Sequence, residues 1–130
     1  QSELYLPREA APEAFAALRG IGHLIAPVLH VSEVRTVRAD DLWLSPAYGR
    51  DSVTLHFTWH RNPEAVAPVL ETVEERLAPL GARPHWGKLT TLPPADVVAS
   101  YERAADFAGL LERFDPQGKF RNPFVDAHFP

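Results

Sequence analysis

The sequence has no cysteine, no methionine and no excess of basic residues. The 13 Lys and Arg against 17 Asp and Glu give a formal net charge of −4. Without cysteine there is no disulfide framework, thiolate metal site or cysteine nucleophile. Without a basic surface, nucleic acid is not expected as a partner. No apolar run approaches the roughly 20 residues that span a bilayer, and no leader opens the chain. We therefore expect no membrane partner and a cytoplasmic location.

The composition is that of one folded domain. Of the 130 residues, 45% are hydrophobic and 23% are charged, as in globular proteins rather than disordered ones. The chain opens at Gln1 without methionine, directly in a predicted strand. We therefore expect a piece of a longer protein.

Hydrophobic periodicity divides the chain into short strands and amphipathic helices. The predicted strands cover residues 4–6, 27–37 and 53–59, and residues 83–89 are a short extended or looped stretch. The predicted helices cover residues 11–21 and 63–77, followed by a helical region over about 95–114 and a turn at 115–118. Pro68 lies within the second helix, so that helix either kinks there or begins after Pro63. This order predicts an α+β domain, an antiparallel sheet with helices packed on one face. The other face of the sheet would then be free to contact another molecule or domain.

Glu33 and Arg35 are the first candidates for a site. Alternation along residues 27–37 places both on one face, together with Leu29, Val31 and Val37, about 7 Å apart along the strand. They are either an ion pair on a solvated face or a site for a polyhydroxylated ligand. The second interpretation follows because a carboxylate accepts hydrogen bonds from hydroxyls and a guanidinium donates to them.

Thr54, His56 and Thr58 form a second polar row, on a strand whose other face is apolar. Such a row is also typical of an ordinary exposed strand face. His56 and His60 would lie about 13 Å apart at strand spacing, too far to share an ion. We therefore expect no metal site.

The segment from His85 to Lys88 combines an imidazole, an indole, a glycine and an ammonium group. Gly87 would permit a close approach to a flat ligand or a left-handed turn, although an irregular edge with an exposed lysine would have the same composition. Residues 115–122 are interpreted as a turn followed by a strand or tail, a packing element anchored by Phe120 and Phe124.

Four segments together resemble the aldonolactone and alditol oxidase family of vanillyl-alcohol-oxidase-like flavoproteins. They are residues 3–8, Glu33 to Arg35, residues 83–88 and residues 115–122. The resemblance implies that residues 1–130 form the C-terminal substrate-binding (cap) domain. It also implies that a separate N-terminal domain binds FAD, commonly through a covalent link to histidine, and would be this chain's partner.

Within that family the sequence is most similar to alditol (xylitol) oxidases. The resemblance assigns polyol contacts to Glu33, Arg35, Thr58 and Lys88, with His56 beside them. It makes Glu33, Arg35 and Lys88 the catalytic group and implies that His85 touches the flavin.

The implied reaction oxidises the terminal hydroxyl of an alditol such as xylitol or sorbitol to the aldose, and dioxygen is reduced to hydrogen peroxide. Lactone-oxidising members often carry a histidine two residues after the lysine, whereas Thr90 stands here, which favours an open-chain polyol. The alternatives are an aldonolactone oxidase of the same family and a non-catalytic ligand-binding or dimerisation module. The 130-residue chain alone is expected to be inactive.

Overall fold

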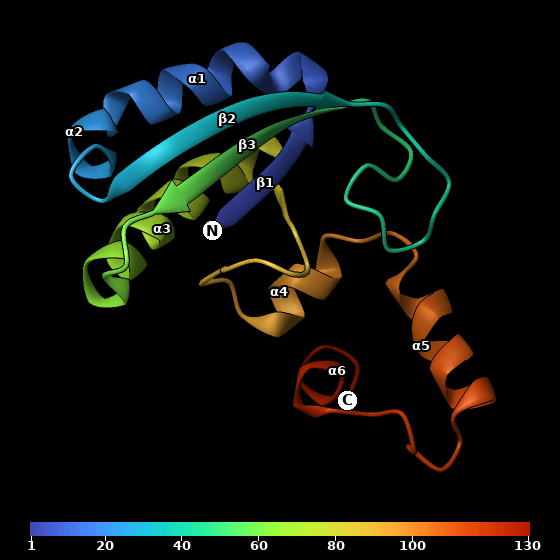
Figure 1. Cartoon of the computed structure of the whole chain (residues 1–130). Helices are drawn as coiled ribbons and strands as arrows, with labels where there is room; N and C mark the ends of the chain where they lie inside the picture. The colour runs from blue at the N-terminus through green and yellow to red at the C-terminus, as the bar shows by residue number, and fades with distance from the viewer.

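The computed structural model describes residues 1–130 as a four-stranded sheet with helices (Figure 1). The strands are β1 (Ser2–Pro7), β2 (Leu29–Val37), β3 (Ser52–Trp59) and β4 (Arg83–Pro84). The α-helices are α1 (Ala11–Gly20), α2 (Gly22–Ile25), α3 (Pro63–Leu77), α4 (Pro94–Ala99), α5 (Ala104–Phe114) and α6 (Pro123–His128). Two 3-10 turns, η1 (Arg8–Ala10) and η2 (Ala78–Leu80), follow β1 and α3.

The sheet has the order β2-β3-β1-β4 and is antiparallel throughout. Its centre is β3, whose alternating side chains Val53, Leu55, Phe57 and Trp59 are buried on one face. The predicted α+β class with an antiparallel sheet is therefore confirmed. None of the helices is long and apolar enough to cross a bilayer.

Helices α1 and α3 cover the apolar face of the sheet and complete the main core. Helix α3 contributes the predicted stripe, in which Val66, Leu70, Val73 and Leu77 are buried and Val69 is partly buried. It begins at Pro63, where the Asn62 side chain accepts a hydrogen bond from the Ala65 amide. The helix runs through Pro68, so the later start considered from the sequence is wrong. On α1 the buried residue is Ala14, whereas Phe15 is exposed.

Strand β2 corrects one prediction about side-chain direction. Leu29 pairs with Trp59, but Val31 pairs with Thr58, so the register shifts between them. Such a bulge sends side chains on either side of it to opposite faces. Leu29 therefore packs against the core, while Val31, Glu33 and Arg35 lie on the opposite face with Thr58, His56 and Thr54.

The C-terminal third differs from its prediction in one place. The helical region expected over residues 95–114 is present as two helices, α4 and α5, divided by residues 100–103, where the buried Tyr101 donates a hydrogen bond to the carbonyl of Pro84. The strand or tail expected after residue 118 is the short helix α6. Phe120 is 76% exposed and therefore does not anchor it. These helices form a second small core around Val97, Tyr101, Ala104 and Phe129, apart from α1 and α3 (Figure 1).

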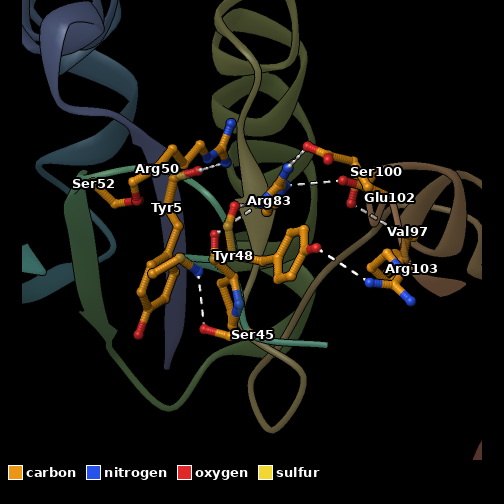
Figure 2. A network of polar contacts seen from close by, with 12 residues as sticks. Tyr5, Ser45, Tyr48, Arg50, Ser52, Arg83, Val97, Ser100, Glu102 and Arg103 are labelled. Carbon is orange, nitrogen blue, oxygen red and sulfur yellow. Dashed lines mark hydrogen bonds and ion pairs between the residues drawn. The ribbon is translucent and has the colours of Figure 1, made fainter. Parts of the chain in front are cut away.

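The buried Arg83 side chain joins this third of the chain to the sheet (Figure 2). Its guanidinium donates to the carbonyls of Ser100 (2.9 Å), Tyr48 (3.1 Å) and Pro46 (3.3 Å). It also pairs with Glu102 at 3.4 Å. Nearby, Arg50 donates to the carbonyl of Tyr5, and burial together with the charge of Arg83 lowers the pKa of Arg50 to about 10. Strand β4 is thereby fixed, and with it the segment that leads to Lys88.

Candidate functional site

The sheet face opposite α1 and α3 carries a row of polar side chains from three adjacent strands. The antiparallel register places Glu3 of β1 beside His56 of β3, and His56 beside Glu33 of β2. One pair along, Thr54 lies between Tyr5 and Arg35. Because paired residues project to the same side of a sheet, residues far apart in sequence form one surface.

Glu3 is the centre of this surface. It is only 4% exposed, and each of its carboxylate oxygens is paired with a different cation. Oε1 accepts from the Arg35 guanidinium at 3.0 Å, and Oε2 accepts from the Lys88 ammonium at 2.5 Å. A buried carboxylate is stable only when it is paired in this way.

Arg35 also binds Glu33, through Nη2 and the Glu33 carboxylate at 2.6 Å. The two side chains point the same way, as their spacing in the strand predicted. The Glu33 side chain is 49% exposed. Arg35 therefore links a buried carboxylate to an open one, and Glu33 keeps a face toward solvent.

Lys88 reaches the cluster because the chain after β4 stays attached to β1. The His85 amide donates to the carbonyl of Glu3, and the Leu89 amide donates to the carbonyl of Gln1. Beyond Lys88, the buried Glu74 carboxylate of α3 accepts from Thr90 and Thr91. Gly87 has no positive φ, so of the two roles considered for it the left-handed turn is wrong.

The charges around Glu3 determine the ionisation of the neighbouring groups. Burial raises the pKa of Glu3, but the hydrogen bond from Lys88 and the charges of Lys88 and Arg35 outweigh burial, so its pKa lies below the usual 4.5. Burial, together with the charges of Lys88 and Arg35, lowers the pKa of His56 below 6.5. The Glu3 carboxyl is therefore ionised and the His56 imidazole is neutral at neutral pH.

Thr54 and His56 are both buried, in contrast to the ordinary exposed strand face considered from the sequence. The Thr54 hydroxyl lies near Glu3 but makes no hydrogen bond of ordinary geometry, and His56 Nδ1 likewise has no partner. These two positions thus form the floor of the polar face.

The structure brings four of the predicted site residues together: Glu33, Arg35, His56 and Lys88. Thr58 is half-buried two positions beyond His56 on β3, opposite Val31. His85 lies at the β4 end, where its ring centroid is 6.4 Å from that of Tyr5 and its Nδ1 accepts from the Gly87 amide. Neither the Thr58 side chain nor the His85 side chain hydrogen-bonds to the charged side chains of the cluster.

Glu3, the residue that joins the cluster, was not among the predicted site residues. The sequence feature that could have revealed Glu3 is the alternation in β1, where Glu3 and Tyr5 project opposite to Leu4 and Leu6. Its partners Arg35 and Lys88 follow 32 and 85 residues later. Only the sheet register connects them.

The chemistry of this face defines the class of ligand that it suits. Two carboxylates balance two cations, and a neutral imidazole and a threonine hydroxyl lie beside them. Such a set offers many donors and acceptors and no net charge, so it suits an uncharged, hydroxyl-rich small molecule.

Comparison with known proteins shows the family of the chain. The sequence model of the D-arabinono-1,4-lactone oxidase family matches residues 1–128. The chain belongs to this family.

Three relatives illustrate the range of the family. The chain is 50% identical over 125 residues to the alditol oxidase of a Streptomyces species, which covers 96% of the chain and 30% of that protein. It is 30% identical over 129 residues to mouse L-gulonolactone oxidase, covering 95% and 29%. It is also 30% identical over 126 residues to L-gulono-1,4-lactone dehydrogenase of Mycobacterium tuberculosis, covering 96% and 29%. The chain thus spans under a third of the length of these relatives.

Proposed function

We propose that residues 1–130 are the C-terminal substrate-binding (cap) domain of an FAD-dependent oxidase that acts on alditols. The reaction converts the terminal CH–OH of a polyol such as xylitol or sorbitol to the aldehyde of an aldose, and O2 becomes H2O2. The carrying observation is the charge-balanced cluster of Glu3, Glu33, Arg35 and Lys88 on the open sheet face. The 50% identity to an alditol oxidase supports the choice of substrate.

Each side chain has a role that its surroundings permit. Glu33, being half-exposed, accepts hydrogen bonds from polyol hydroxyls, while the Arg35 guanidinium donates to a neighbouring hydroxyl. Thr58, farther along β3, holds hydroxyls distant from the reacting carbon. The neutral His56 imidazole can donate or accept a hydrogen bond beside them.

Lys88 and Arg35 also contribute to catalysis, because they place positive charge beside the reacting hydroxyl. As the terminal carbon would give up a hydride to the flavin and its hydroxyl would give up a proton to solvent, negative charge develops on the alcohol oxygen. Lys88 and Arg35 stabilise that charge where it develops, and they are already fixed by Glu3 before the substrate binds. The Glu33 carboxylate binds the hydroxyl next to the reacting carbon, and this contact fixes the orientation of that carbon.

The cofactor consistent with this arrangement is FAD, and the residues present fit one part of it. The β4 end of the polar face offers Lys88 and the neighbouring rings of Tyr5 and His85, a suitable surface for a flat, electron-accepting ring. The chain offers no glycine-rich loop for the phosphates. FAD, when bound, accepts the hydride and passes the electrons to O2. We propose that an N-terminal domain holds it, with a covalent link, and that His85 contacts its ring.

The second candidate is oxidation of an aldonolactone by the same site, which is favoured by the names of the mouse and mycobacterial relatives. The residue two positions after Lys88 is Thr90, whose hydroxyl is bound to Glu74 rather than directed at the polar face. That arrangement supports the polyol. A non-catalytic ligand-binding or dimerisation module, in which the free sheet face pairs with itself, is the alternative from another class. A cytoplasmic location stays a prediction.

The experiment is a peroxide assay of the full-length protein in which this chain follows an FAD domain. Xylitol, sorbitol and L-gulono-1,4-lactone are compared by kcat/KM. We expect peroxide from both alditols and a lower kcat/KM for the lactone. A higher kcat/KM for the lactone would favour the second candidate, and no peroxide from any of the three would refute an oxidase of this class.

A further inference from the structure

We infer that Glu3 is a positioning residue, which fixes the Lys88 ammonium and the Arg35 guanidinium in the arrangement that the reaction needs. This inference rests on the proposed function and adds a residue to it. Glu3 is the only carboxylate that pairs with both cations, one through each oxygen. Lys88 has no other acidic partner.

Glu3 acts through its neighbours rather than on the substrate. It is 4% exposed, and both oxygens are already occupied by cations, so a ligand on the polar face meets Arg35, Glu33 and Lys88 instead. With its pKa below the usual value, the carboxyl stays ionised throughout the neutral range and does not exchange protons there. These properties distinguish it from Glu33, which is open to a ligand.

The Glu3 carboxylate is held rigidly, as a positioning group must be. Glu3 is in the interior of β1, paired with His56 on one side. On the other side, its carbonyl accepts a hydrogen bond of 3.0 Å from the amide of His85. Arg35 arrives from β2 and Lys88 from the segment after β4, so three parts of the chain converge on one carboxylate.

The balance of charge gives the same conclusion. Without the Glu3 carboxylate, Lys88 and Arg35 would face Glu33 alone, and the cluster would carry a net positive charge. The two cations would then repel each other, and Lys88 would turn toward water, since its side chain is 17% exposed. The Lys88 ammonium would then no longer lie where the negative charge develops on the alcohol oxygen.

The test is a double-mutant cycle in the full-length oxidase, comparing the wild type, Glu3→Gln, Lys88→Met and the double variant. We expect Glu3→Gln alone to lower kcat/KM for xylitol by about 30- to 100-fold, because misplacement of a catalytic group costs rate steeply. In the Lys88→Met background the same change is expected to cost less than about tenfold, since only Arg35 remains for Glu3 to position. Equal factors in both backgrounds would overturn the inference and leave Glu3 as part of the fold only.

Binding provides a readout that does not depend on turnover. The Kd of xylitol, measured by calorimetry on protein whose flavin is already reduced so that no hydride can be transferred, is expected to rise in Glu3→Gln and to rise less when the change is made on Lys88→Met. A Kd that rises equally in both backgrounds contradicts positioning. If Glu3→Gln does not fold, Glu3→Asp takes its place in the cycle, because it keeps the charge but cannot reach both cations.

The outcomes separate the two proposals. A wild-type protein that yields no peroxide overturns the proposed function and, with it, this inference. An active wild type with additive effects overturns the inference alone, and an active wild type with the predicted coupling supports both.

Discussion

Two glutamates on the same sheet face differ because of their surroundings. Glu3 is in an inner strand, where burial forces it to pair with Arg35 and Lys88. Glu33 is on the edge strand β2, where its side chain is half-exposed and has one partner. The same carboxylate is therefore a fixed support in one position and an available acceptor in the other. The exposed pair alone would add little stability, so we propose a binding role for it rather than a structural one.

His56 gives a prediction at this scale. The pKa of His56 is lowered in the folded chain, so near pH 6.5 the unfolded chain binds a proton that the folded chain does not bind. Stability is therefore lost as pH falls below about 6.5. We expect the melting temperature to fall less between pH 7.5 and pH 5.5 in His56→Gln than in the wild type, as measured by circular dichroism. Equal losses in both proteins would show that His56 is not the group responsible.

Sequence spacing could predict part of the site at this scale. Glu33 and Arg35 are two residues apart in one strand, and strand geometry alone places them together. Alternation along residues 53–59 supplied His56 and the resemblance supplied Lys88. Glu3 lies in one of the segments that carry the resemblance, but neither spacing nor resemblance gave it a role in the site. A carboxylate whose partners follow 32 and 85 residues later leaves no local pattern.

The strands and long helices could be predicted from periodicity, since burial of one face determines them. Strand β3 and helix α3 follow their predicted faces. The bulge between Leu29 and Val31 could not be predicted, because the alternation of the sequence continues through it. The break between α4 and α5 also depends on a distant contact, the hydrogen bond from Tyr101 to the carbonyl of Pro84.

Arg83 gives a prediction at the scale of these elements. Arg83→Met keeps most of the side-chain volume but leaves the carbonyls of Pro46, Tyr48 and Ser100 without this donor. We expect a loss of about 2–4 kcal/mol in the free energy of unfolding, as is usual for buried hydrogen-bond networks. Urea titration measures it, and hydrogen exchange should rise in residues 38–51 and 100–103.

The matched control is Arg113→Met, which removes an exposed arginine of α5 that makes no ion pair and contacts only the ring of its neighbour Phe114. Little change in stability is expected there. If both variants lose the same free energy, Arg83 has no special role in joining the C-terminal third to the sheet.

The whole molecule has two apolar cores and one polar sheet face. The main core fixes the three long strands, and the second core holds the C-terminal helices beside β4 (Figure 1). Lys88 lies in the segment between the two cores. Its ammonium group pairs with Glu3 of β1, and Thr90 and Thr91, which follow it, hydrogen-bond to the buried Glu74 carboxylate. The packing of the two cores therefore determines where the Lys88 ammonium lies on the polar face.

A prediction for the 130-residue chain follows from its content. Because it offers part of a ring-binding surface and no phosphate-binding loop, we expect it to purify without colour and to release no peroxide from xylitol. Visible absorption spectroscopy checks the first expectation. A stoichiometric flavin spectrum in this chain would mean that residues 1–130 hold the cofactor by themselves.

The central claim is that the polar sheet face is the substrate site, and Glu33 tests it most directly. In the full-length oxidase, kcat/KM for xylitol is measured for the wild type, for Glu33→Ala and for Glu75→Ala, an exposed carboxylate of α3. The account predicts a loss of at least about 100-fold for Glu33→Ala, with normal folding, because the substrate loses its orientation. It predicts wild-type activity for Glu75→Ala. Wild-type activity in Glu33→Ala would contradict the claim and leave the Glu33–Arg35 pair as a surface ion pair.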